Sequence, residues 1–162
     1  MTKTADAVIV GGGVIGLSVA FQLARLKFGK IVLLEKELFL GTGATAKCAG
    51  GVRAQFTTKV NIEMSMKSEE MLVNFEEDTG YPLVFAQNGY MFLLSDEKEL
   101  EDFTKAVELQ RSLGLNVDFI DPPEINRIAP PVKTEDIIKA TFCNDDGIAD
   151  PGDMTQGYAS AA

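Results

Sequence analysis

Residues 6–35 read DAVIVGGGVIGLSVAFQLARLKFGKIVLLE, and this stretch decides the fold that the sequence predicts. Its first five residues, 6–10, are apolar after the aspartate and rich in β-branched side chains, which predicts a short buried strand. Three glycines follow, and residues 14–27 then carry apolar side chains at helical spacing. Residues 31–34 are a second apolar strand. A strand, a helix and a strand within about thirty residues predict a β-α-β unit whose strands run parallel.

The glycines between the first strand and the helix have the spacing Gly11-x-Gly13-x-x-Gly16. At this spacing the first glycine permits a tight turn, the second lets a pyrophosphate approach the backbone, and the third lets the helix pack closely. The helix N-terminus then presents N–H groups to the phosphates. Glu35, at the end of the second strand, can accept hydrogen bonds from ribose hydroxyls and would repel a 2′-phosphate, which disfavours NADP. The pattern predicts a dinucleotide site, and the β-α-β unit alone does not distinguish NAD from FAD.

Composition excludes several other classes of protein. The 162 residues include 15 Lys+Arg and 24 Asp+Glu, and a net charge of −9 argues against nucleic acid as a partner. Histidine is absent, which removes His-based catalytic triads and His-containing zinc sites. The two cysteines, Cys48 and Cys143, make no disulfide framework, so a reducing, cytoplasmic setting is the default expectation.

Two segments resemble other kinds of site. Residues 5–24 are apolar enough to suggest a membrane helix or a signal peptide, but each of their three consecutive glycines would cost about 1 kcal/mol in a helix. We therefore expect no transmembrane segment. Residues 144–147, NDDG, resemble a calcium loop, but an EF-hand aligned on Gly147 would need an acid where Phe142 stands. No metal site is expected.

The rest of the chain alternates between helical and strand patterns. Helices are expected over residues 57–77, over 96–113 with Asp96 and Glu99 in capping-box spacing, from Pro122, and from Pro151 to Ala162. Strands are expected over residues 84–87, 90–94, 117–120 and 137–143. Asn88-Gly89 predicts that the first two of these strands form a hairpin.

Residues 41–56, GTGATAKCAGGVRAQF, resemble the flavin loop of the D-amino-acid oxidase and sarcosine oxidase superfamily. The resemblance covers the whole chain and looks closest to the sarcosine oxidase β-subunit and dye-linked proline dehydrogenase branch. It implies an α/β, glutathione-reductase-like FAD-binding fold that is incomplete, with a Rossmann-type unit and part of a second, substrate-binding sheet. Residues 1–80 would bind FAD, residues 81–143 would belong to the substrate-binding domain, and residues 144–162 would return toward the FAD domain.

The same resemblance implies roles for individual residues. FAD contacts are implied at Gly11, Gly13, Val14, Ile15, Gly16, Glu35, Lys36, Gly43, Ala44, Thr45, Cys48, Ala49 and Gly50. Some relatives attach FAD covalently through a histidine that aligns with Lys47, so FAD is expected to be non-covalent here. Arg53 falls where some relatives place an arginine on the substrate carboxylate, a task that suits a guanidinium fork. A structural role for Arg53 stays equally open, and no catalytic residue is assigned.

The function that the resemblance implies is oxidation of the C–N bond of an amino acid or secondary amine of the sarcosine, glycine or proline type. A hydride would pass to flavin N5, and water would hydrolyse the resulting imine. Because family members are more than twice as long, we expect an N-terminal half that is inactive alone. It could be a fragment, half of an enzyme completed by a complementary chain, or a small self-sufficient binding protein. A non-catalytic FAD-binding subunit and an NAD-dependent dehydrogenase remain alternatives.

Overall fold

The structure is a computed structural model that describes residues 4–162, and internal contacts divide the chain into two units. Unit 1 contains the residues up to Gly51 together with Leu72–Phe85 and Ala149–Ala162. Unit 2 contains Val52–Met71 and Ala86–Ile148. The division into an FAD-binding part (residues 1–80), a substrate-binding part (81–143) and a segment that returns toward the FAD domain (144–162) stays a prediction.

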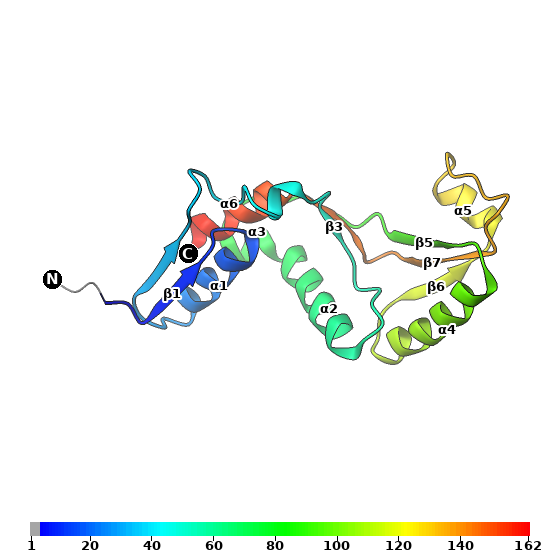
Figure 1. Cartoon of the computed structure of the whole chain (residues 1–162), viewed down its shortest axis with the longest axis horizontal. Helices are drawn as coiled ribbons and strands as arrows, with labels where there is room; N and C mark the ends of the chain where they lie inside the picture. Colours follow the sequence, from blue (N-terminus) through cyan, green and yellow to red (C-terminus); the bar gives the residue numbers. More distant parts are fainter. Residues whose placement is uncertain (1–3) are drawn as a thin grey trace. The chain divides into compact units, whose positions relative to one another are not determined.

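Unit 1 begins with the predicted β-α-β unit, which the structure confirms (Figure 1). Strand β1 (Ala7–Val10) pairs in parallel with β2 (Ile31–Leu34), and helix α1 (Val14–Arg25) connects them. The ladder runs residue by residue from Ala7 opposite Ile31 to Val10 opposite Leu34. Its apolar strands and the amphipathic helix thus form the α/β arrangement that the sequence predicts.

An aromatic cluster forms the core of unit 1. Helix α6 (Pro151–Ala161) packs against α1 and against the short helix α3 (Phe75–Thr79). The Tyr158 ring lies 5.5 Å from the Phe21 ring and meets the Phe75 ring edge-on at 4.9 Å. Gly157 permits this approach, because a Cβ there would collide with the Phe75 ring. The segment from Leu72 and the C-terminal segment are therefore held to the β-α-β unit by ring contacts.

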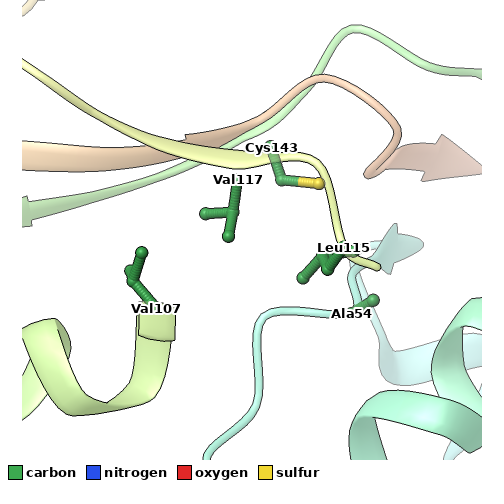
Figure 2. Close-up of a cluster of buried hydrophobic side chains, with 5 residues drawn as sticks. All are labelled: Ala54, Val107, Leu115, Val117 and Cys143. Carbon is green, nitrogen blue, oxygen red and sulfur yellow. The ribbon is translucent and has the colours of Figure 1, made fainter. Parts of the chain in front are cut away.

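Unit 2 is built on a three-stranded antiparallel sheet in the order β5-β7-β6 (Figure 1). The central strand β7 (Lys139–Cys143) pairs with β5 (Tyr90–Leu94) on one side and with β6 (Val117–Ile120) on the other. Helix α4 (Glu97–Ser112) contributes to a buried cluster with this sheet. Figure 2 shows the side chains of that cluster turned toward one another: Ala54, Val107, Leu115, Val117 and Cys143.

The N-terminus of α4 has the predicted cap. The Asp96 carboxylate accepts a hydrogen bond from Glu99 N at 2.8 Å, and the Glu99 carboxylate accepts one from Ser95 N at 3.1 Å. The reciprocal bond therefore reaches one residue further back than in a standard capping box, but it satisfies the helix end in the same way.

The remaining elements are short, except for one helix. They are the 3-10 helix η1 (Thr45–Lys47), α2 (Lys59–Val73), α5 (Pro122–Ile128), and the strands β3 (Gly51–Val52), β4 (Phe85–Ala86) and β8 (Gly147–Ala149). The three strands form a sheet in the order β3-β8-β4. Within residues 4–162, every helix is too short or too polar to cross a lipid bilayer.

Two predictions about local structure are wrong. The strands on either side of Asn88-Gly89 form no hairpin, because β4 joins β8 while β5 pairs with β7 in another sheet. Gly89 N instead donates to Asp146 O at 2.9 Å, so the turn is held by a distant segment. The single helix expected over residues 57–77 is two helices that meet at Asn74, where Phe75 turns into the aromatic cluster.

We predict that Phe75→Ala lowers the free energy of unfolding by about 3–5 kcal/mol, the usual cost of deleting a buried ring. Phe75 is 1% exposed and contacts Tyr158 edge-on. Phe39→Ala is the matched control, because Phe39 is 68% exposed. Urea unfolding of both variants tests this, and equal losses of stability would contradict the packing described here.

Candidate functional site

The turn after β1 is shaped by backbone constraints that only glycine meets. Gly11 has φ +107, a left-handed conformation, and its N–H donates to Leu34 O at 2.7 Å. A Cβ on Gly16 would collide with the carbonyl oxygen of Gly11. The first turn of α1 therefore packs on the glycine turn only because position 16 has no side chain, which agrees with the role that the spacing predicts.

The N-terminus of α1 keeps backbone N–H groups available. The first N–H groups of any helix have no partner within the helix. Val14 N donates to Thr45 Oγ1 at 3.2 Å, which engages one of them. The N–H groups of Ile15 and Gly16 have no acceptor among residues 4–162. These two amides, at the positive end of the helix dipole, can donate to a phosphate group.

Glu35 closes the turn from the end of β2. Its Oε2 accepts a hydrogen bond from Gly12 N at 2.7 Å, and its Oε1 accepts one from Glu37 N at 2.9 Å. These N–H groups, first that of Glu37 and then that of Gly12, hold the pKa of Glu35 below its ordinary value. The side chain is therefore a carboxylate at neutral pH. Each of its oxygens has a second lone pair that can accept from a ribose hydroxyl.

The loop after β2 is hydrogen-bonded to the glycine turn and to the start of α1. Gly41 N donates to Gly12 O at 2.8 Å, and Ala46 N donates to Gly41 O at 2.9 Å as the chain enters η1. Thr45 then places its hydroxyl against Val14 N at the start of α1. The loop and the turn thus form one hydrogen-bonded wall.

Sequence reasoning missed two contributors to this wall. Gly12 was treated only as the middle residue of the glycine run, yet a Cβ there would lie 2.5 Å from Leu40 Cδ2. The threonine hydroxyl bond to the helix start was not foreseen either, because its partners are 31 residues apart. The run of three consecutive glycines was the available signal that a side chain at position 12 would displace its neighbours.

The turn, the helix start and the loop line an open cavity of about 990 Å³. Ligand pockets have volumes of about 300–1,000 Å³, so this cavity is large enough for a large ligand. The residues that were expected to contact FAD and that line it are Gly11, Gly13, Val14, Ile15, Gly16, Glu35, Lys36, Gly43, Ala44 and Thr45. Segments as far apart in the sequence as Gly11 and Thr45 thus meet around one space.

Three residues expected to contact FAD lie outside the lining of this cavity: Cys48, Ala49 and Gly50. Cys48 is exposed, and its Sγ donates to Thr45 O at 3.1 Å. Gly50 is buried with φ +78, and a Cβ there would collide with Ala149 O. Ala149 N donates a hydrogen bond to Gly50 O at 2.9 Å. Gly50 thus connects the loop to the residues that precede α6.

Arg53 belongs to unit 2, where aromatic rings surround it. Its guanidinium carbon lies 4.6 Å from the centre of the Phe56 ring, 4.9 Å from that of Phe92 and 5.7 Å from that of Tyr90. Nη1 donates to Gln55 O at 3.1 Å. Arg53 also lines a cavity of about 280 Å³ with residues of α4. The remaining guanidinium N–H groups have no acceptor among residues 4–162 and can donate to a carboxylate, and the stacking also suits a structural role.

No group of three or more side chains suited to metal binding occurs among residues 4–162. The cavity of about 990 Å³ offers backbone amides, the carboxylates of Glu35 and Glu37, and the ammonium groups of Lys36 and Lys47. Amide and ammonium donors suit a pyrophosphate, and a carboxylate at the end of β2 suits ribose hydroxyls.

A family model described as FAD dependent oxidoreductase matches residues 6–162. The chain belongs to this family. FAD is the cofactor on which the family depends. The glycine turn, the two available amides and the carboxylate of Glu35 fit its diphosphate and ribose groups, so the residues present agree with the family's cofactor.

Individual relatives share about three residues in ten with the chain. It is 32% identical to FAD-dependent oxidoreductase domain-containing protein 1 from Bos taurus, over 96% of the chain and 34% of that protein. It is 28% identical to mitochondrial sarcosine dehydrogenase from Mus musculus, over 100% of the chain and 18% of that protein. L-Proline dehydrogenase from P. horikoshii superposes with a TM-score of 0.90 at 31% identity, over 99% of this chain and 42% of that one. The chain thus spans less than half the length of each.

We predict that Gly16→Ala weakens both folding and FAD binding. The new Cβ would collide with Gly11 O, and relieving such overpacking costs about 1–3 kcal/mol and shifts the turn. Gly43→Ala is the matched control for folding, since a Cβ at Gly43 meets nothing within 4 Å. Thermal unfolding compares the two variants, and titration with FAD compares Gly16→Ala with the wild type. A Gly16→Ala protein with the melting temperature of the control and the FAD affinity of the wild type would show that the turn tolerates a side chain.

Proposed function

We propose that this chain is the FAD-binding, N-terminal part of an oxidoreductase that oxidises the C–N bond of an amino acid or secondary amine. The observation that carries the proposal is the cavity in unit 1, where the glycine turn, two available helix amides and an ionised glutamate surround one space. The substrate class is supported by the similarity to sarcosine dehydrogenase and to L-proline dehydrogenase. We infer a substrate of the sarcosine, glycine or proline type.

The residues of unit 1 bind and orient the cofactor in this proposal. The amides of Ile15 and Gly16 hold the diphosphate, Glu35 holds the adenosine ribose, and Gly43 to Thr45 lie along the diphosphate and ribityl chain. FAD, when bound, supplies the acceptor for a hydride from the carbon that bears the amine. Cys48, Ala49 and Gly50, which lie outside the lining of the cavity, would hold the isoalloxazine ring. FAD is held without a covalent bond, because the chain has no histidine and Lys47 stands where some relatives attach it.

Arg53 is proposed to bind the substrate carboxylate. A guanidinium that stacks on rings keeps a fixed orientation, and fixed donors bind a planar carboxylate well. The structural alternative uses the same contacts, in which the arginine joins β5 to the segment that follows β3. The effect of Arg53→Lys on KM and on the melting temperature separates the two roles.

Turnover is proposed to need more protein than this chain. The relatives extend well beyond the matched region, since the chain spans 34% of the bovine protein and 42% of the proline dehydrogenase. We infer that the substrate-facing groups are completed by further polypeptide, either in the same chain or in a complementary one. If the complementary chain alone carries the chemistry, this chain acts as a non-catalytic FAD-binding subunit.

The visible absorption spectrum of the purified protein tests the cofactor. We expect flavin absorption that passes into the supernatant after acid precipitation, because non-covalent FAD is released when the fold is lost. A colourless protein that gains no flavin spectrum after incubation with FAD would contradict FAD binding. Colour that stays with the precipitate would instead contradict non-covalent attachment.

We predict that Arg53→Lys raises KM for the amino-acid substrate in the complete enzyme by about tenfold to a hundredfold. A charged hydrogen bond contributes roughly 1.5–3 kcal/mol, and lysine cannot reproduce the fork. Arg25→Lys is the matched control, because Arg25 also stacks on a ring, that of Phe21, at 5.4 Å. A fall in melting temperature with unchanged KM would assign Arg53 to the structural role.

A further inference from the structure

An acidic residue occupies the buried face of helix α2. Ile62, Met66 and Glu69 follow one another at positions i, i+4 and i+7, which places them on one stripe of the helix. Ile62 is fully buried, and Met66 packs against the hydrophobic cluster of unit 2. Glu69 continues this apolar stripe and is only 6% exposed. A carboxyl group in such a place needs a partner or has to lose its charge.

The partner of Glu69 is a second buried acid, Asp146, which is 0% exposed. Its Oδ1 accepts a hydrogen bond from Ala54 N at 2.8 Å, and its Oδ2 accepts one from Gln55 Nε2 at 2.9 Å. Gln55 Oε1 in turn accepts from Thr141 Oγ1 at 2.8 Å. Both oxygens of Asp146 thus accept from N–H groups, whereas Oε1 of Glu69 has no such donor within residues 4–162.

Within residues 4–162, no cation balances the second carboxyl group. The charged groups that act on Glu69 are Asp146 and Asp145, both in the turn between β7 and β8. Arg111 of α4 is directed elsewhere, since its Nε donates to Val117 O at 2.8 Å. The guanidinium of Arg53 is directed to Gln55 O and the aromatic rings.

Burial, first, and then the charge of Asp146 raise the pKa of Glu69 to about 8. The Cys143 thiol beside the pair stays neutral, because burial and Asp146 raise its pKa to about 12. Oε1 of Glu69 has no hydrogen-bond partner in the described part of the chain. The geometry leaves Glu69 as a proton donor toward Asp146 and leaves nothing else to neutralise it.

We propose that Glu69 and Asp146 share one proton in the folded protein at neutral pH, and that the hydrogen bond formed by this proton stabilises the packing of α2 against the turn between β7 and β8. The O–H of Glu69 donates to Asp146, so the pair carries one negative charge in place of two. Loss of the proton leaves two carboxylates facing each other in the interior, which releases this part of α2. Unit 2 thus contains a pH-sensitive interaction between helix α2 and the turn that connects β7 to β8.

The direction of the pH dependence follows from the two protonation equilibria. In the unfolded chain the Glu69 carboxyl group loses its proton near the ordinary pKa of 4.5, and in the folded chain it keeps it up to a pKa of about 8. Folding therefore takes up a proton between these values. The stabilisation is complete below about pH 4.5, decreases as the pH rises, and is lost above about pH 8.

The test compares Glu69→Gln with Glu70→Gln. Glutamine at 69 keeps the shape and a donor toward Asp146 but cannot ionise, whereas Glu70 lies on the exposed side of α2, where it binds Lys67. Between pH 5 and 8 we expect the folding equilibrium constant of the wild type to fall, relative to Glu69→Gln, by up to about tenfold per pH unit, the limit for one proton. Glu70→Gln should keep the wild-type dependence. Equal pH profiles for the wild type and Glu69→Gln would overturn the proposal.

Infrared spectroscopy of the folded protein gives a second test that needs no unfolding. We expect the carbonyl stretch of a protonated carboxyl group in the wild type at pH 7, its loss near pH 8, and its absence in Glu69→Gln. A wild-type spectrum without that band at pH 7 would overturn the proposal. So would stabilisation by added Ca²⁺ at pH 7 that Glu69→Gln abolishes, since a cation and not a proton would then neutralise the pair.

Discussion

The hydrogen bond from Gly12 N to the Glu35 carboxylate is the contact on which the candidate cofactor site depends. It joins the turn after β1 to the end of β2, which are 23 residues apart. Gly41 N then donates to Gly12 O, and Thr45 accepts from Val14 N at the start of α1. Three separate segments are thereby fixed around one space before any ligand binds. Such preorganisation lowers the ordering cost of binding a long, flexible dinucleotide.

Local signals in the sequence predicted those parts of the fold that are stabilised locally. The β-α-β unit and the cap of α4 depend on contacts within a few residues or on periodicity, and both are present as expected. The hairpin at Asn88-Gly89 failed for the opposite reason. Gly89 donates to Asp146 O, and β5 pairs with residues some fifty positions away. A turn signal states that the chain reverses or bends, and the choice of partner strand belongs to the tertiary structure.

The candidate site was predictable to a similar extent. The glycine spacing and the acid at the end of β2 identified the residues of the turn and the helix start, because their roles follow from backbone geometry. The bond between Thr45 and the helix start could not be predicted, since nothing in the loop sequence says which amide its hydroxyl meets. The burial of Glu69 could not be predicted either. It lies within a charged helical stretch, and only the packing of Ile62 and Met66 shows that its position is buried.

Glu35 and Glu69 show how the same side chain takes opposite protonation states in one small protein. Two backbone N–H groups lower the pKa of Glu35, so its charge persists in the candidate cofactor site. Burial and a neighbouring carboxylate raise the pKa of Glu69, so its charge is suppressed where nothing could compensate it. The difference lies in the donors that each backbone provides: the glycine turn has amides to spare, whereas the amide of Ala54 is already engaged by Asp146. The two glutamates therefore differ in protonation because amides donate to Glu35, whereas the N–H donors of Ala54 and Gln55 near Glu69 are engaged by Asp146.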